Sequence, residues 1–145
     1  MMAAPSINRR QARILAMQTL CHLDVTPNSP VDATLSLLAA ADDAPPPDEA
    51  QTHYARHLLE TYHAFAKTID ELIAARLKNW DMPRLDPVDR NVLRVAVTEL
   101  THKDVPPKVA NNEAIEIARD YGSADSPPFV NGLLDNIRKF LYPET

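Results

Sequence analysis

Three arginines near the N-terminus form the clearest group of side chains that could bind a ligand. Arg9, Arg10 and Arg13 fall within five residues, and helix positions three or four apart lie on one face. We therefore expect all three side chains to fan over one face of the first helical turns. The guanidinium group is a planar fork that pairs with phosphate oxygens, so the pattern indicates nucleic-acid contact. Arginines on an exposed helix face are, however, most often only solvated.

The distribution of charge limits the kind of nucleic acid that fits. The chain of 145 residues carries a net charge of −5, but residues 1–30 hold three arginines against one acid, Asp24. A small basic end on an acidic body suits a short piece of nucleic acid and disfavours a long one. The acidic remainder suits a basic protein partner.

Other combinations of reactive side chains are incomplete. His53, His57 and Glu60 have the helical spacing of a zinc site, but no third histidine or cysteine is placed to complete it, so we predict no metal and no cofactor. The sequence has no glycine-rich phosphate loop, nucleophile elbow or histidine–carboxylate set, so we predict that the protein is not an enzyme. The single cysteine, Cys21, excludes an internal disulfide and suits a reducing compartment.

The residues from Asp86 to Leu100 predict the central helix of the domain. Asp86 is a good N-cap, Pro87 fits the first helical position, and Asp89 falls at the third, where its carboxylate can reach back toward the cap. Apolar residues cover most of this helix. Other helices must therefore pack around it.

The rest of the chain predicts further helices in one all-α domain. They are expected near 6–23, at 31–41, at 48–79 as one helix or as two with a bend near 64–68, at 107–121 and from Ser126 onward. Gly122 is expected at a C′ position and Gly132 at a close helix crossing. We divide the chain into a flexible N-terminus (1–5), an N-terminal half (6–79) and a C-terminal half (84–142). No apolar run is long enough to span a membrane and no secretory signal is evident, so we expect a cytoplasmic protein.

Five segments together resemble the NusB family of bacterial transcription antitermination factors. They are Arg9-Arg10-Gln11-Ala12-Arg13 with Ala16, Gln18 and Leu20; Val92 to Leu100; Val105-Pro106 through Val109 to Asn112-Glu113-Ala114; Ala118 with Tyr121-Gly122; and Ser126 with Phe129 to Asp135. Each segment alone is weak. Their order and spacing are specific, and they cover about 130 residues.

The resemblance implies a fold, a ligand and partners. It implies a compact all-α bundle of about seven helices in two packed helical subdomains. It also implies a non-catalytic factor that binds boxA-like single-stranded RNA of nascent ribosomal RNA transcripts together with NusE, a small-subunit ribosomal protein. Other Nus factors and RNA polymerase would be indirect partners.

The resemblance also assigns roles to individual residues. Arg9, Arg10 and Arg13 are the primary RNA candidates, with Gln18 weaker and Phe129 a possible stacking surface for a base. The residues matched to the NusE side or to antitermination are Asp89, Arg90 and Asp125. Asn112, Glu113 and Asn131 are interpreted as buried groups that tie the last two helices together.

The chain departs from the family pattern at four positions: Cys21, Thr98, Asn111 and Pro128. We interpret each as a loss of apolar, aromatic or basic surface near the ligand. The departures leave open a divergent scaffold or homodimer that binds protein only. An accessory subunit of an RNA-modifying enzyme is a third possibility.

Overall fold

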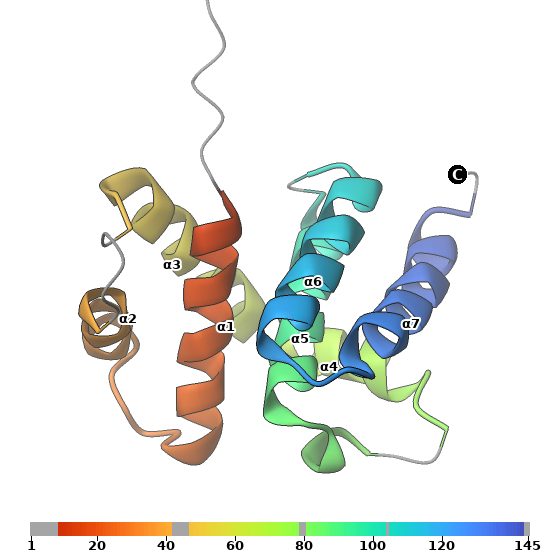
Figure 1. Ribbon diagram of the computed structural model, residues 1–145, viewed down its shortest axis with the longest axis horizontal. Coiled ribbons are helices and arrows are strands. Elements are labelled where there is room, and N and C mark those ends of the chain that lie inside the picture. Colours follow the sequence, from red (N-terminus) through yellow and green to blue (C-terminus); the bar gives the residue numbers. More distant parts are fainter. Residues whose placement is uncertain (1–8, 42–46, 79–80, 104, 144–145) are drawn as a thin grey trace, which may run out of the picture.

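All regular elements of the described chain are helices, which confirms the all-α prediction (Figure 1). The computed structural model describes residues 9–41, 47–78, 81–103 and 105–143. Within them lie seven α-helices and one short 3-10 helix: α1 (Arg9–Val25), α2 (Val31–Ala40), α3 (Glu49–Ala64), α4 (Ala66–Ala74), η1 (Met82–Arg84), α5 (Pro87–His102), α6 (Pro107–Tyr121) and α7 (Ser126–Leu141). The first residues of the helix expected near 6–23 and the terminus 1–5 lie outside the described residues. No helix in the described chain is long and apolar enough to cross a membrane.

Helix α5 is the centre of the bundle, as its sequence predicted. The Asp86 side chain accepts a hydrogen bond from the Val88 N–H at 2.9 Å, and Pro87 occupies the first turn. Leu93 and Val97 are fully buried on α5. Helices α1, α3, α4, α6 and α7 all contact α5. The cap therefore fixes where the helix begins, and the apolar surface draws the other helices around it.

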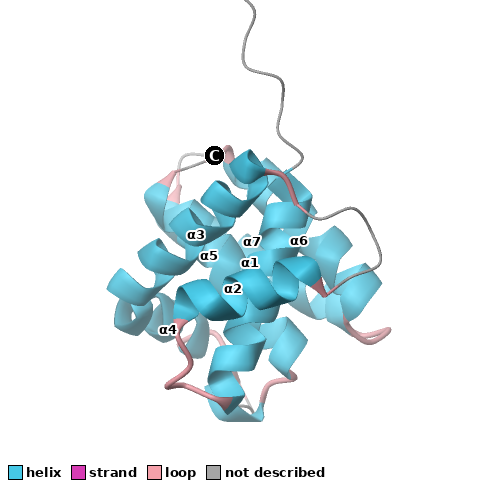
Figure 2. Ribbon diagram, turned by 90° about the vertical axis from the view of Figure 1, so that its left-hand side faces the viewer, coloured by secondary structure: helices cyan, strands magenta, loops and turns pink. Residues whose placement is uncertain are grey.

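Helices α1 to α3 and helices α6 and α7 flank α5 on different sides (Figure 1). Helix α1 packs against α2 and α3, while α6 packs against α7. Figure 2 shows α2 lying across the outer side of α1. In Figure 1, α1 begins at the end of the bundle opposite to the one where α5 and α7 begin. This opposition separates the predicted site residues into two groups.

The helical segment at 48–79 forms two helices. Helix α3 ends at Ala64 and α4 begins at Ala66, and Phe65 between them leaves helical geometry with φ −123° and ψ 23°. The break falls within the predicted bend. Asp48 and Gln51 form a capping box at the start of α3, so the beginning of α3 is fixed by local hydrogen bonds.

Gly122 follows the end of α6 as predicted, but its backbone geometry differs from that of a left-handed C′ residue. Gly122 has φ −95° and ψ −162°, so it is extended rather than left-handed. A Cβ at Gly122 would clash with Ser126 Oγ and lie 2.8 Å from the Ala118 carbonyl oxygen. Gly122 is thus required because Ser126 and the Ala118 backbone lie too close to leave room for a side chain. The prediction for Gly132 is wrong, because a Cβ there would meet nothing within 4 Å.

The prediction that Asn112 and Asn131 are buried ties between α6 and α7 is also wrong. Both side chains belong to exposed residues. Their helices meet instead through apolar residues such as Ala114, Ile117, Val130 and Leu134. An amide has no role in such a contact, since apolar side chains pack without needing hydrogen bonds.

Candidate nucleic-acid interface

Arg13 does not share the exposed face predicted for it. It is 4% exposed, and its Nε donates to both Glu99 carboxylate oxygens at 2.9 and 3.1 Å. Its Nη1 lies 3.4 Å from Glu113 Oε1. Helical spacing places Arg13 above Met17 and Leu20, which are buried. The side chain therefore belongs to the interior, and the expectation that three arginines fan over one face is wrong.

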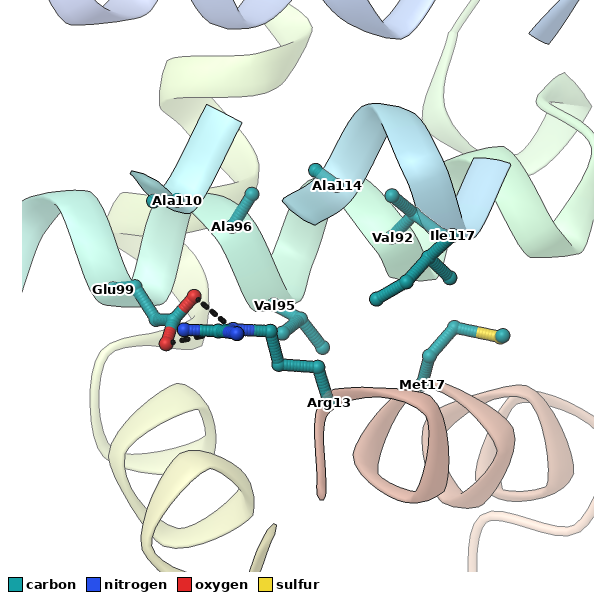
Figure 3. Close-up of a pocket in the computed structure, with 9 residues that line it drawn as sticks. All are labelled: Arg13, Met17, Val92, Val95, Ala96, Glu99, Ala110, Ala114 and Ile117. Carbon is teal, nitrogen blue, oxygen red and sulfur yellow. Dashed lines mark hydrogen bonds and ion pairs between the residues drawn. The ribbon is translucent and has the colours of Figure 1, made fainter. Parts of the chain in front are cut away.

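Apolar side chains surround the Arg13–Glu99 pair. Figure 3 shows Arg13 reaching from α1 toward Glu99 along a small cavity between α1, α5 and α6. The other lining residues are Met17, Val92, Val95, Ala96, Ala110, Ala114 and Ile117. Because charges removed from water must be paired, the fully buried Glu99 of α5 is the partner that allows Arg13 to be buried.

Tyr54 of α3 completes the surroundings of Glu99. Its hydroxyl donates a hydrogen bond to Glu99 Oε2, and the residue is buried. Burial and the nearby Glu99 carboxylate raise the pKa of Tyr54 above its usual value. The phenol therefore stays protonated at neutral pH and remains a donor.

Arg10 reaches the surface but is held by α6. Its Nε and Nη2 donate to the two Glu113 oxygens at 2.9 and 2.7 Å, and its side chain is 38% exposed. This hydrogen bond raises the pKa of Arg10 and lowers the pKa of Glu113. Glu113 is therefore a structural residue as predicted, but it ties α6 to α1 rather than to α7.

Arg9 lies on the other side of the start of α1, against α3. Its guanidinium carbon is 4.3 Å from the centroid of the Tyr54 ring, within cation–π range. Arg9 and Tyr54 also line an open groove of about 880 Å³, together with His53 and Arg56 of α3. Arg9 and Arg10 thus present two cations at one end of the bundle, with an aromatic ring beneath one of them.

Two further RNA candidates lie away from these cations. Gln18 is half-buried on α1, eight residues after Arg10, which corresponds to about 12 Å along a helix. Phe129 is half-buried at the start of α7 and lines a second pocket. In Figure 1 this end of α7 is opposite to the start of α1. The structure therefore does not bring Phe129 together with the arginines.

The second pocket gathers Phe129 with two residues predicted to face a protein partner. It measures about 340 Å³ and is lined by Arg84, Leu85, Asp86, Asp89, Asp125 and Phe129. Asp125 is exposed, whereas Asp89 is only 9% exposed. We refer to these six residues as the acidic pocket.

Asp89 is unusual within the acidic pocket because one of its oxygens is left unpaired. Oδ1 is buried without a hydrogen-bond partner among the described residues. Burial raises the pKa of Asp89, although a hydrogen bond from Ser126 opposes this. Asp89 therefore joins the start of α5 to the start of α7, and the cap is made by Asp86 alone.

Arg90 faces inward, although it was predicted to face a protein partner. Its side chain is 11% exposed and pairs with Asp24 at 3.0 Å. Its Nη1 also donates to the carbonyl oxygens of Met82 and Leu85, each at 3.1 Å. Arg90 thus holds the η1 turn against α5.

The four departures from the family pattern are not all near a ligand surface. Thr98 is fully buried and donates to the Arg94 carbonyl oxygen at 2.7 Å, and Asn111 is also buried. Both are interior substitutions, contrary to our interpretation. Cys21 is half-buried, and burial raises the pKa of its thiol. Pro128 is exposed in the first turn of α7.

The histidine pattern on α3 forms no complete site in the described part of the chain. His53, His57 and Glu60 are exposed there. Among the described residues no three histidine, cysteine or acidic side chains gather closely enough to hold a metal ion. His53 lines the groove beside Arg9 instead.

Sequence reasoning missed two partners of the arginines. Glu99 and Tyr54 were not singled out, although they enclose Arg13 and support Arg9. A signal was available for Glu99, since it falls between Val95, Ala96 and Leu100 on the apolar part of α5, where a carboxylate needs a cation. No comparable signal in the sequence pointed to Tyr54.

Comparison with known proteins relates this geometry to a family. The model of the NusB family matches residues 10–139. The transcription antitermination protein NusB of Treponema pallidum is 42% identical over 136 residues, covering 93% of this chain and 95% of the relative. NusB of Myxococcus xanthus is 37% identical over 89% of this chain and 93% of the relative. These relatives are antitermination proteins, which agrees with the prediction that the chain is not an enzyme.

Solved structures give the same relationship. A structure of T. maritima NusB superposes with a TM-score of 0.79 at 36% identity, covering 95% of this chain and 93% of that one. Another, of the antitermination factors NusB and NusE in complex with double-stranded RNA, has a TM-score of 0.79 at 26% identity, covering 91% and 96%. On the family match, the identities and the shared fold, the chain belongs to the NusB family.

Proposed function

We propose that this chain is a transcription antitermination factor that binds boxA-like RNA of nascent ribosomal RNA transcripts together with NusE. It acts in the cytoplasm, where it joins the RNA polymerase elongation complex with other Nus factors. The likeness to NusB proteins over nearly the whole chain supports the role. The observation that carries RNA binding is the pair of cations, Arg9 and Arg10, at the start of α1.

The proposed RNA contacts follow from which arginines reach solvent. Arg9 and Arg10 bind backbone phosphates, because a guanidinium group binds phosphate oxygens through paired N–H donors. Arg13 supports the site from the interior. The open groove beside Tyr54 and His53 gives the strand a path along α3. Such a small basic surface fits a short single strand.

The acidic pocket is the proposed contact for NusE. A basic side chain from the partner would pair with the exposed Asp125 at the rim, and the Asp89 carboxylate adds negative charge to the wall of the pocket. Phe129 lies in the same pocket, so a base that stacks on it belongs to RNA extending toward the partner. Arg90 supports the pocket from within.

A partner is physically useful because the protein alone is a weak RNA binder. Two surface arginines neutralise few phosphates, so binding releases few counterions from the RNA. The net charge of −5 also repels RNA. A second RNA-binding protein held beside the first raises the effective concentration of each for the same strand. The proposal therefore predicts cooperative binding of RNA and NusE.

The test is a titration of fluorescent boxA RNA with the wild-type chain, with and without NusE, at several salt concentrations. We expect NusE to tighten RNA binding, and we expect Arg10→Ala to weaken it about tenfold. Arg119→Ala is the matched control, because it removes an equally charged, 54% exposed side chain on α6. Its effect should be within about twofold.

Two results would reject the proposal in different ways. Equal losses of RNA affinity in Arg10→Ala and Arg119→Ala would show that RNA binds to positive charge in general and not at the assigned site. No RNA binding with or without NusE, alongside an intact protein complex on size exclusion, would instead favour a protein-only scaffold.

A further inference from the structure

Side chains around the start of α1 form a continuous series of contacts. Arg9 lies over the Tyr54 ring, and the Tyr54 hydroxyl bonds to Glu99. Glu99 pairs with Arg13, Arg13 approaches Glu113, and Glu113 holds Arg10 in a two-pronged pair. This series of contacts joins α1, α3, α5 and α6, and the two surface arginines, Arg9 and Arg10, lie at its ends.

Glu113 should have two opposite effects on RNA binding. Glu113 is an anion beside a proposed phosphate contact, so its charge alone should weaken binding of RNA. Its hydrogen bonds to Arg10, however, restrict a long side chain that otherwise samples many rotamers. An arginine that is already ordered loses less freedom when it binds phosphate.

We infer that Glu113 is a positioning residue for RNA binding, with Arg13, Glu99 and Tyr54 supporting it from the interior. Glu113 holds Arg10 by the Nε–Nη2 edge, at 2.9 and 2.7 Å, while 38% of the side chain stays exposed. Tyr54 orients Arg9 in the same way through its ring, which Glu99 fixes through the hydroxyl. This inference rests on the proposed function.

The sizes of the two effects decide whether loss of the Glu113 carboxylate weakens or tightens RNA binding. Immobilising one rotamer-rich side chain on binding weakens affinity roughly two- to twelvefold. Removing one partly exposed charge changes affinity by about twofold or less, because solvent screens it. Positioning therefore outweighs repulsion, and loss of the Glu113 carboxylate should weaken RNA binding although it removes a negative charge.

The chain supplies a matched control for charge on the same helix. Glu116 lies one turn after Glu113 and acts on Arg10 through charge without a hydrogen bond to it. It pairs instead with Arg119. Glu113→Gln and Glu116→Gln thus each remove one negative charge near Arg10, but only Glu113→Gln breaks the two-pronged pair that holds the Arg10 guanidinium.

The experiment measures boxA RNA affinity, in the presence of NusE, for the wild-type chain, both glutamine variants, Arg10→Ala, and Arg10→Ala combined with Glu113→Gln. We expect Glu113→Gln to weaken binding about three- to tenfold and Glu116→Gln to leave it equal or slightly tighter. In the Arg10→Ala background, Glu113→Gln should have no further effect, since Glu113 acts through Arg10.

The outcomes separate this inference from the function on which it rests. If Arg10→Ala weakens binding but Glu113→Gln binds RNA equally well or more tightly, positioning is overturned and the RNA site stands. If Arg10→Ala has no effect, the RNA site fails and positioning fails with it.

A second variant guards against a folding defect. Glu113→Asp keeps the charge but shortens the reach to Arg10, so it should also weaken RNA binding. The ¹⁵N–¹H signal of Arg10 Nε, recorded without RNA, should be protected from exchange in the wild-type chain and lose that protection in both Glu113 variants. An unchanged signal would overturn the proposed restraint directly.

Discussion

The start of α1 and the acidic pocket differ in how their buried charges are satisfied. At the start of α1, the buried Arg13 and Glu99 are paired with each other. The series of contacts to which they belong ends in two surface cations, Arg9 and Arg10. In the acidic pocket, Asp89 is nearly as buried, but one oxygen has no partner among the described residues. An unsatisfied buried group is costly, so it marks a place where a further molecule can contribute. In the proposed function, the first region binds RNA through its surface cations, and the second offers acidic groups to the protein partner.

The largest expected effect comes from breaking the paired region. Arg13→Ala leaves Glu99 buried without its cation, so the free energy of unfolding should fall by about 3–5 kcal/mol. Urea denaturation followed by circular dichroism measures this. Arg10→Ala, which breaks the half-exposed pair, should cost only about 0.5–1 kcal/mol. Similar losses for the two variants would show that burial does not distinguish these arginines.

An intermediate effect is expected from crowding the support of the acidic pocket. Gly122→Ala would place a Cβ 2.7 Å from the Ser126 Cβ and 2.8 Å from the Ala118 carbonyl oxygen. Because backbone must shift, thermal unfolding should show a loss of about 1–3 kcal/mol, and Ser126 should move away from Asp89. Gly132→Ala is the control, with no neighbour within 4 Å, and should stabilise α7 by about 0.5–1 kcal/mol. A stabilised Gly122→Ala protein would contradict the close packing.

The smallest effect on stability is expected at Asp89, where its sign depends on pH. Because burial raises the pKa of Asp89, its ionised form is disfavoured by folding. The wild-type chain should lose stability relative to Asp89→Asn as pH rises from the ordinary pKa of an aspartate through the raised one. Urea denaturation of both proteins across that range isolates this difference. A wild-type chain that gains relative stability instead would contradict the raised pKa.

The sequence predicted local features better than those formed between distant residues. The cap at Asp86 and the proline after it depend on neighbours in the chain, and the structure confirms them. The break at Phe65 decides between one helix and two, which the sequence left open. The burial of Arg13 depends on Glu99, 86 residues away. The extended backbone of Gly122 depends on the position of Ser126, which packs against it at the start of α7. The separation of Phe129 from the arginines depends on helix directions, which no spacing along the chain reveals.

One measurement tests the two-region account most directly. Backbone NMR spectra of the labelled chain are recorded with boxA RNA alone, with NusE alone, and with both. The account predicts that RNA alone shifts signals at the starts of α1 and α3, around Arg9, Arg10 and Tyr54. NusE alone should shift signals at the starts of α5 and α7, around Asp89 and Phe129. If RNA alone shifted only the acidic pocket, or NusE shifted only the start of α1, the assignment of the two regions would be contradicted.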